Sequence, residues 1–514
     1  MNLGAIPRRN SRRFPDKPAL VFEGVSLTWQ QVNDRVNALV HALREMGVGK
    51  GDRLGILMHN RFHYWEVYWA AAKAGIIVVP FNYRLTPGDL EQLANHAEIK
   101  ALVAGEECFS QVDCLRERVK TITIFLGIGK GPEYMADYEE LVTTYPIKEP
   151  IFEAEDHDTF AIFYTSGTTG LPKGAMVSHR NLEANSFNQM IADKSMENDI
   201  NLTVTPLYHM GAVFFGLTYH YLGCTTYINQ RFDPKEALES LSREKITVCL
   251  LIPTMLNMLL NVPEFEQYDL SRLRLIFYGG GPMPQSVLEK AIKQIGCGFT
   301  QGYGLTETLE ASFLVSSDHV LEGTEKQRKR LLSAGREAVG AEVRIVNESG
   351  IDLPYGEVGE ILIRSDSVIQ GYWKMPEVTA ETIKGGWFFT GDLGYLDDDR
   401  YLYVVDRKKD MIISGGVNIY PKEIEEVLYA NPKVLEAAVI GVCDEMWGEN
   451  VMALVVLREH TIATESEMIE FCKLHLASHK KPKIVQFVDG LPKNPSGKIL
   501  KGVLRDMYGD EKKV

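Results

Sequence analysis

A segment rich in glycines and hydroxyl groups carries the strongest chemical signal in the chain. It reads Y-T-S-G-T-T-G-L-P-K-G from Tyr164 to Gly174 and follows an apolar strand candidate at 160–164. Glycines let the backbone approach an anion, hydroxyl and N–H groups donate to it, and a lysine adds positive charge. The phosphate loop of nucleotide kinases has Gly-Lys-Ser/Thr, whereas here Pro172 precedes Lys173 and Gly174 follows it. The segment therefore predicts a phosphate site of another kind, with a flexible surface loop as the alternative.

A second pattern, Q-G-Y-G-L-T-E-T at 301–308, combines an aromatic ring with a carboxylate. Tyr303 offers a flat face on which a planar base can stack, and Glu307 offers the hard oxygen that Mg²⁺ prefers. By itself the pattern fits equally well a Gly-Tyr-Gly turn followed by a helix that starts at the glutamate.

Two patterns nearer the C-terminus place charged groups among glycines and prolines. The first joins T-G-D at 390–392 to D-R-K-K-D at 406–410 and S-G-G at 414–416. An aspartate can accept hydrogen bonds from ribose hydroxyls, although the charge run alone is typical of a solvated linker. The second, P-K-N-P-S-G-K at 492–498, presents one lysine on a stiff loop. Taken alone, a solvated tail lysine is the simpler interpretation.

The elements that position these groups alternate between strand and helix through the first half of the chain. The predicted strands lie at 20–22, 54–58, 76–79, 101–103, 160–164, 248–252 and 273–278. The predicted helices lie between Thr28, which opens a capping box, and Gly47, and at 64–74, 181–191, 234–244, 254–260 and 284–294. This alternation predicts helices packed on a mostly parallel sheet.

The predicted secondary structure changes after Thr324. Short strands at 343–346, 360–363 and 401–405, separated by glycine turns, predict a β-rich subdomain. The tail then predicts a compact α+β unit, with helices at 422–429 and 465–476 and strands at 437–442, 451–457 and 485–488. The net charge changes at the same place, because the residues from Arg407 onward are balanced and the part before them carries the whole charge of -14. We expect a domain boundary at 406–409.

The amino-acid composition and net charge exclude several classes of protein. With 514 residues, 45% hydrophobic and 24% charged, the chain has ample core for a globular protein. Its negative charge disfavours nucleic acid. The 7 cysteines form no CxxC pair, and the histidines show no metal spacing such as HExxH. Neither a targeting signal nor a membrane span is apparent in the sequence. We therefore expect a cytoplasmic protein in a reducing compartment. No motif in the sequence indicates the oligomeric state, so a homodimer is one of the states that the sequence allows.

Taken in order, the motifs resemble those of the adenylate-forming superfamily of acyl-CoA synthetases, adenylation domains and luciferases. The resemblance covers nearly the whole chain and is strongest to bacterial fatty-acyl-CoA ligases, through P-L-Y-H at 206–209, G-G-G-P at 279–282 and D-M-I-I-S-G-G at 410–416. Two positions depart from the pattern: Val417 stands where many relatives have Glu, and Arg400 stands where a turn glycine is usual.

The resemblance implies a fold in two unequal parts. Residues 1–406 would form a large α/β N-terminal domain, with stacked α/β sheet subdomains and a β-rich subdomain, that binds AMP and the acyl group. Residues 407–409 would be a hinge that pivots at Lys409. Residues 410–514 would form a smaller, mobile α+β C-terminal domain that carries Lys498.

The resemblance also implies site residues, with ATP, a carboxylic acid and CoA as substrates and Mg²⁺ as the metal. The β- and γ-phosphates of ATP would be held by Thr165, Ser166, Gly167, Thr168, Thr169, Gly170 and Lys173. The rest of the nucleotide would be bound by Gly280, Gly281, Pro282, Gln301, Gly302, Tyr303, Gly304, Asp392 and Arg407. Tyr208, His209, Tyr278 and Gly279 would line the acyl pocket, and Gly415 and Gly416 the CoA tunnel. The catalytic residues would be Glu307, which holds Mg²⁺, Thr306 at the α-phosphate, and Lys498 between the carboxylate and the α-phosphate.

The implied reaction is the ligation of an acid to CoA. A carboxylate attacks the α-phosphorus of ATP, pyrophosphate leaves, and CoA thiolate then displaces AMP from the acyl-adenylate. The alternatives are an enzyme that loads a carrier protein, a luciferase-like oxidative relative, and a protein that binds nucleotide or acyl groups without turnover. The chain ends soon after Lys498 without a carrier segment, which favours free CoA. The apolar stretch at 210–216 predicts an apolar pocket, whose length, branching and aromatic preference stay open.

Overall fold

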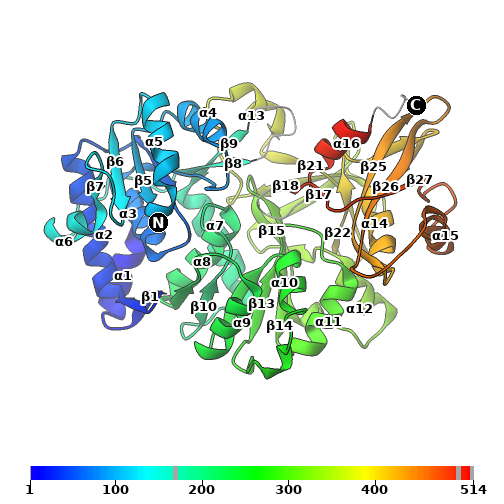
Figure 1. Cartoon of the computed structure of the whole chain (residues 1–514), viewed down its shortest axis with the longest axis horizontal. Helices are drawn as coiled ribbons and strands as arrows, with labels where there is room; N and C mark the ends of the chain where they lie inside the picture. The colour runs from blue at the N-terminus through cyan, green and yellow to red at the C-terminus, as the bar shows by residue number, and fades with distance from the viewer. Residues whose placement is uncertain (1, 166–171, 494–498, 510–514) are drawn as a thin grey trace.

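Four β-sheets organise the chain. The computed structural model describes residues 2–165, 172–493 and 499–509. Figure 1 shows the first sheet and its helices at one end in blue and cyan, the second in green, and the C-terminal elements in orange and red at the opposite end. The predicted fold class is confirmed: a large α/β region precedes a smaller α+β region.

The first sheet has the strand order β19-β9-β8-β4-β3-β5-β6-β7. Its strands are β3 (Arg53–Leu57), β4 (Ile77–Pro80), β5 (Ala101–Gly105), β6 (Ile124–Ile128), β7 (Ala136–Asp137), β8 (Thr159–Thr165), β9 (Lys173–Ser178) and β19 (Gly371–Tyr372). The central pairs are parallel, whereas β9 runs antiparallel to both β8 and β19. Because successive strand residues point to opposite faces, the side chains of the sheet pack into two hydrophobic cores, one on each face. Helices α4 (Pro87–Ala97) and α5 (Phe109–Arg118) cover one face.

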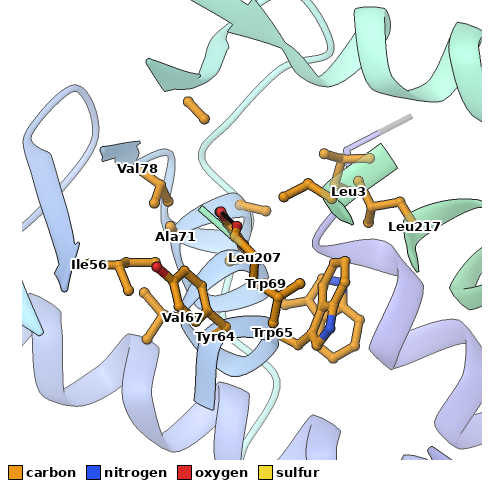
Figure 2. Close-up of a cluster of buried hydrophobic side chains, with 14 of the residues drawn as sticks. Leu3, Ile56, Tyr64, Trp65, Val67, Trp69, Ala71, Val78, Leu207 and Leu217 are labelled. Atoms are coloured by element: carbon orange, nitrogen blue, oxygen red, sulfur yellow. Dashed lines mark hydrogen bonds between the residues drawn. The ribbon is translucent and has the colours of Figure 1, made fainter. Parts of the chain in front are cut away.

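Aromatic side chains fill the layer on the other face. It contains α2 (Trp29–Glu45), α3 (Phe62–Ala74) and α6 (Tyr138–Thr144), and every residue of α3 is buried. Figure 2 shows Trp65 and Trp69 of α3 in a cluster with aliphatic side chains that include Ile56 and Val78 of the first sheet and Leu217 of α8 (Met210–Leu222). Thr28 caps α2 through the predicted capping box, so this local signal correctly marked the start of the helix.

The second sheet has the order β16-β15-β14-β13-β12-β10-β11-β1-β2. Its strands are β1 (Pro18–Phe22), β2 (Val25–Thr28), β10 (Ile200–Thr203), β11 (Thr225–Ile228), β12 (Val248–Leu251), β13 (Leu275–Tyr278), β14 (Gly298–Leu305), β15 (Leu309–Leu314) and β16 (Arg336–Glu337). Helices α9 (Pro234–Arg243), α10 (Pro253–Leu259) and α11 (Gln285–Ile295) cover its outer face. On its inner face, α7 (His179–Asp193) and α8 (Met210–Leu222) lie in the layer shared with the first sheet. The two sheets are therefore stacked through common helices.

The structure at 301–308 excludes one interpretation that the sequence left open, a Gly-Tyr-Gly turn followed by a helix. The Gly-Tyr-Gly segment is no turn and no helix starts at Glu307, because β14 runs through Gly304 and forms a hairpin with β15. A Cβ on Gly304 would lie 1.6 Å from the carbonyl oxygen of Leu309. Only glycine allows the two strands to approach this closely.

The third and fourth sheets complete the molecule. The third contains β17 (Ala341–Val346), β18 (Gly359–Ser365), β20 (Ile383–Lys384), β21 (Trp387–Leu396) and β22 (Leu402–Arg407), all antiparallel. The fourth contains β23 (Ile412–Ser414), β24 (Val417–Ile419), β25 (Val434–Asp444), β26 (Gly448–Leu457) and β27 (Ile484–Phe487), with α14 (Pro421–Ala430), α15 (Glu465–His475) and α16 (Lys501–Tyr508). The remaining helices are α1 (Ala5–Arg13), α12 (Glu325–Lys329) and α13 (Pro376–Thr382). Within the described ranges, no helix has both the length and the apolar character needed to cross a bilayer.

Candidate active site

The β14–β15 hairpin carries several of the predicted site residues at the carboxyl edge of the second sheet. Tyr303 lies on β14, and Thr306 and Glu307 lie in the connection to β15. The connection is fixed by a hydrogen bond from the Leu305 N–H to Thr308 Oγ1 at 2.9 Å. The N–H of Ile369 donates to the Glu307 carbonyl oxygen at 2.9 Å, which ties the same turn to a distant segment.

The Glu307 carboxylate lies beside both described ends of the glycine-rich segment. Thr165 ends β8, Lys173 begins β9, and the two residues are paired across the antiparallel ladder. Thr165 Oγ1 is 3.5 Å from Glu307 Oε1, and the Tyr372 hydroxyl donates to the same oxygen at 3.1 Å. Lys173 Nζ lies 5.2 Å from the centre of the Tyr372 ring. A carboxylate, two hydroxyls and an ammonium group therefore converge at this point.

Five of the predicted phosphate-binding residues lie outside the described residues. They are Ser166, Gly167, Thr168, Thr169 and Gly170. Their predicted role remains a prediction, as does that of Lys498, which also lies outside the described ranges.

A second cluster joins β14 to the third sheet. Asp392 is buried on β21, directly opposite Arg407 of β22. Asp392 Oδ1 lies 3.1 Å from Arg407 Nε, and Oδ2 accepts a hydrogen bond from the Tyr303 hydroxyl at 2.9 Å. Burial and the Asp392 charge raise the pKa of Tyr303 well above its usual value, so the phenol stays a neutral donor. Because a carboxylate has about four lone-pair sites, Asp392 retains capacity for a ligand hydroxyl.

The glycines after β13 lie beside this cluster. Strands β13 and β14 are parallel, with Tyr278 opposite Gln301, so 279–282 and 302–304 emerge at the same edge of the sheet. A Cβ on Gly279 would lie 2.7 Å from the Gly302 carbonyl oxygen, whereas Gly281 has open space around it. Gly280 has a φ of +76°, which favours glycine. The carboxyl edge of parallel strands is where ligands bind in such sheets.

The residues predicted for the acyl pocket provide polar atoms without formal charge. Burial lowers the pKa of His209 to about 4, so the ring is neutral at physiological pH, and its buried Nε2 has no hydrogen-bond partner among the described residues. The same holds for the buried Tyr208 hydroxyl within the described ranges, and burial raises its pKa. The Tyr278 hydroxyl lies 2.9 Å from His319 Nε2. His209 immediately precedes the apolar helix α8, which places an uncharged surface next to the carboxyl edge.

The predicted CoA-tunnel residues lie in the fourth sheet. Gly415 and Gly416 form the turn between β23 and β24, with φ values of +59° and +77°. The Gly415 N–H donates to the Trp447 carbonyl at 2.7 Å, and a Cβ on Gly415 would lie 2.6 Å from the Trp447 ring. Among the described contacts, none joins this turn to Glu307.

The segment predicted as a hinge makes contacts in both directions. The Lys408 N–H donates to the Gly391 carbonyl at 2.9 Å, and Lys408 Nζ lies 3.1 Å from Glu360 of the third sheet. On the other side, Asp410 pairs with Arg505 of α16 at 2.8 Å. Lys409, between them, is exposed, and partial desolvation of its amino group lowers the pKa of its side chain. The boundary at 407–409 stays a prediction.

Tyr372 is a site residue that the sequence analysis missed. It belongs to a two-residue strand, and only the pairing of β19 with β9 brings its hydroxyl to Glu307. No local pattern around it indicated this contact.

Stacked α/β sheets with carboxylates, hydroxyl groups and glycines at one carboxyl edge are typical of a nucleotide-binding enzyme. Residues 7–373 match the family model described as AMP-binding enzyme, and residues 423–498 match that of the AMP-binding enzyme C-terminal domain. The chain belongs to the AMP-binding enzyme family, which confirms the resemblance to adenylate-forming enzymes.

Two similar proteins place it among acyl-CoA synthetases, and a solved structure shares its fold. A feruloyl-CoA synthase from an Amycolatopsis species is 36% identical over 508 residues, which are 99% of each chain. The long-chain-fatty-acid–CoA ligase FadD13 of Mycobacterium tuberculosis is 34% identical over 513 residues, with 99% of this chain and 98% of the relative covered. The crystal structure of ATP-bound MatB from Rhodopseudomonas palustris has a TM-score of 0.89 at 30% identity and covers 100% of both chains.

Proposed function

We propose that the chain is an AMP-forming acid–CoA ligase that activates a carboxylic acid with ATP at the edge of the second sheet. The observation that carries this proposal is the contact of Glu307 with Thr165, at one end of the glycine-rich segment, and with Tyr372, while Tyr303 of the same hairpin bonds to Asp392 of the third sheet. This arrangement offers separate places for a triphosphate and a ribose. Acyl transfer to CoA would follow at the same centre.

The residues around Glu307 fit Mg²⁺. The described contacts of its Oε1 are two neutral hydroxyls, and no ion pair among the described residues involves it, so the carboxylate can accept a cation. Mg²⁺ is usually held by one or two carboxylates together with substrate phosphates and waters, which agrees with a single carboxylate here. When bound, the metal would neutralise charge on the phosphoryl oxygens. Thr165 and Tyr372 would orient the carboxylate.

The nucleoside would lie along β14. The Tyr303 ring would stack on adenine, with Gly280, Gly281 and Pro282 on one side. Asp392 would accept hydrogen bonds from the ribose hydroxyls, held in place by Arg407 and the Tyr303 hydroxyl. Gln301, Gly302 and Gly304 complete this edge, and Thr306 would donate to the α-phosphate. Lys173, near Tyr372, would face the terminal phosphates.

The acid would enter beside His209. A neutral imidazole and the Tyr208 hydroxyl can contact the substrate without repelling its carboxylate. Attack on the α-phosphorus brings two anions together, and Lys498 would supply the positive charge between them. Its loop is followed by α16, whose first residue, Lys501, pairs with Glu425 at 2.7 Å. This pair joins the start of α16, three residues after Lys498 in the sequence, to α14.

CoA would accept the acyl group in the second half-reaction. A thiol with a pKa near 8.5 is already a few per cent thiolate at neutral pH, so no protein nucleophile is required. Gly415 and Gly416 would line the approach of the thiol. Because the reaction uses ATP and CoA, we place it in the cytoplasm.

The test is an acid-dependent assay with products resolved. We expect pyrophosphate release that requires ATP and an acid, and thioester plus AMP only when CoA is added. Glu348→Gln, on the exposed surface of the third-sheet region, serves as a matched control for substitutions of Glu307. Formation of ADP, or pyrophosphate release without acid, would refute the reaction. Transfer to a carrier-bound thiol but not to CoA would favour the carrier-loading alternative.

A further inference from the structure

A side chain of the third sheet caps a helix of the C-terminal unit across the predicted domain boundary. Asp406 lies on β22, which pairs with β21 of the third sheet. Its Oδ2 accepts a hydrogen bond from the backbone N–H of Lys422 at 2.9 Å, and Lys422 lies in the first turn of α14. The segment 407–409, predicted as a hinge, lies between the acceptor and the donor in the sequence.

Helix α14 obtains this cap from outside its own segment. Within the described residues, Tyr420 at the N-cap position makes no side-chain hydrogen bond to the first turn, and Pro421 after it has no N–H to donate. The Glu423 N–H donates to the Tyr420 carbonyl at 3.2 Å, so Lys422 carries an N–H that a capping side chain would normally bind. Asp406 supplies that acceptor, and its negative charge lies where the helix dipole favours it.

The Asp406 carboxylate is held in place by further bonds. The residue is buried, and its Oδ1 accepts a hydrogen bond from the Arg407 N–H at 2.7 Å. The Lys422 side chain adds a second bond across the boundary, because its Nζ donates to the Val404 carbonyl of β22 at 2.8 Å. Two hydrogen bonds therefore join β22 to the start of α14.

These bonds connect parts of the chain that would separate if the C-terminal unit turned about 407–409. Asp406 stays with the third sheet, where it lies opposite Leu393 of β21. Helix α14 stays with the fourth sheet, because Ile424 and Leu428 pack in the core that contains β25 and β26. A rotation about the hinge would withdraw α14 from Asp406 and break the cap. The cap can therefore exist in one arrangement of the two parts and not in the other.

The position of the glycine turn at 415–416 indicates which step this arrangement serves. The turn, proposed to line the approach of CoA, packs on Trp447 of its own sheet. None of the described contacts joins it to Glu307. The arrangement that contains the Asp406 cap is therefore not the one in which this turn would guide the thiol to the carboxyl edge, which leaves it for the adenylation step.

We propose that Asp406 is a positioning residue for the ligase reaction: by capping α14 it holds the C-terminal unit in the arrangement used for adenylation, and the cap breaks when the unit turns for thioester formation. This inference rests on the proposed function and on the hinge at 407–409. Loss of an N-cap shifts an equilibrium by about 2- to 30-fold, so removal of the Asp406 carboxylate should change the balance between the two arrangements on that scale.

The experiment measures the two half-reactions separately in variants of Asp406. Adenylation is followed by pyrophosphate release, and the second step by thioester formation from prepared acyl-adenylate and CoA. We expect Asp406→Ala to lower the ratio of the adenylation rate to the thioester-forming rate by about 2- to 30-fold. Asp406→Asn keeps a capping oxygen and should retain most of the wild-type ratio.

Asp233→Ala is the matched control. Asp233 caps α9 within the large domain, where its Oδ1 accepts from the N–H groups of Lys235 and Glu236 at 3.0 and 2.9 Å. This substitution removes the same kind of bond far from the boundary in sequence and should leave the ratio unchanged. Trypsin gives a readout independent of turnover, because it cleaves after the basic residues at 407–409. Cleavage there should be several times faster in Asp406→Ala than in the wild type or the control.

The outcomes separate this inference from the proposed function. An unchanged or raised ratio in a folded Asp406→Ala variant, or an equal fall in Asp406→Asn, would overturn the inference while the proposed function stands. If Asp406→Ala does not fold, Asp406→Ser replaces it with the same expected fall, because the serine hydroxyl is one bond too short to reach the Lys422 N–H. Failure of the wild-type enzyme to release pyrophosphate with any acid would instead refute the proposed function.

Discussion

The carboxyl edge of the second sheet and the C-terminal unit hold their candidate residues in different ways. At the edge, residues from three sheets already touch: Glu307 contacts Thr165 and Tyr372, and Tyr303 contacts Asp392. In the C-terminal unit, the glycine turn at 415–416 packs on Trp447 of its own sheet, and Arg505 pairs with Asp410. The candidate residues of the carboxyl edge thus already contact one another, whereas we expect those of the C-terminal unit to act through a change of position. The following predictions test this difference.

The largest effect should follow from Lys498→Ala. If this lysine stabilises charge at the α-phosphate only when the small domain closes, adenylation should fall by about 10²–10³-fold, the scale of losing one transition-state donor. Thioester formation from prepared acyl-adenylate and CoA involves no attack at phosphorus and should be largely retained. Both half-reactions are measured separately. An equal loss of both in a variant with an unchanged circular dichroism spectrum would show that the assigned role is wrong.

Glu307→Gln should lower adenylation by on the order of 10²-fold, because an amide is a much poorer Mg²⁺ ligand than a carboxylate. The Mg²⁺ concentration needed for half-maximal pyrophosphate release should rise, while Glu348→Gln leaves it unchanged. If the Mg²⁺ dependence and the turnover stay the same, Glu307 does not belong to the active site.

Lys409→Pro should affect one half-reaction about tenfold more than the other. Proline fixes φ near −65°, whereas a hinge needs its backbone angles to change between two domain arrangements. The ratio of the adenylation rate to the thioester-forming rate is the measurement. A ratio equal to that of the wild type would place the pivot elsewhere.

Tyr372→Phe should have the smallest effect. It removes one donor to Glu307 Oε1 and leaves the ring beside Lys173, so the loss should be about two- to tenfold in adenylation. The second half-reaction from prepared adenylate should not change. A loss of both would indicate that Tyr372 supports the fold rather than the carboxylate.

The sequence predicted most of the elements because their signals are local. The capping box at Thr28 and the apolar run at 248–252 each depend on a few neighbouring residues, and both correspond to elements of the structure. The ambiguity at 301–308 was not local, since the approach of Gly304 to Leu309 exists only once the hairpin forms. Tyr372 was missed for the same reason: a two-residue strand has no periodicity that indicates its partners.

The antiparallel pairing of β8 with β9 has a consequence for the entropy of ligand binding. The ladder continues to the pair Thr165 and Lys173, so the two ends of the glycine-rich segment are held at the separation of neighbouring strands. The entropy of bringing these ends together is therefore lost when the sheet folds and not when a nucleotide binds. Loop-closure entropy grows only with the logarithm of length, so inserting one or two glycines between them should change the stability of the sheet little. Any loss of nucleotide affinity in such a variant would then measure the placement of the donors themselves.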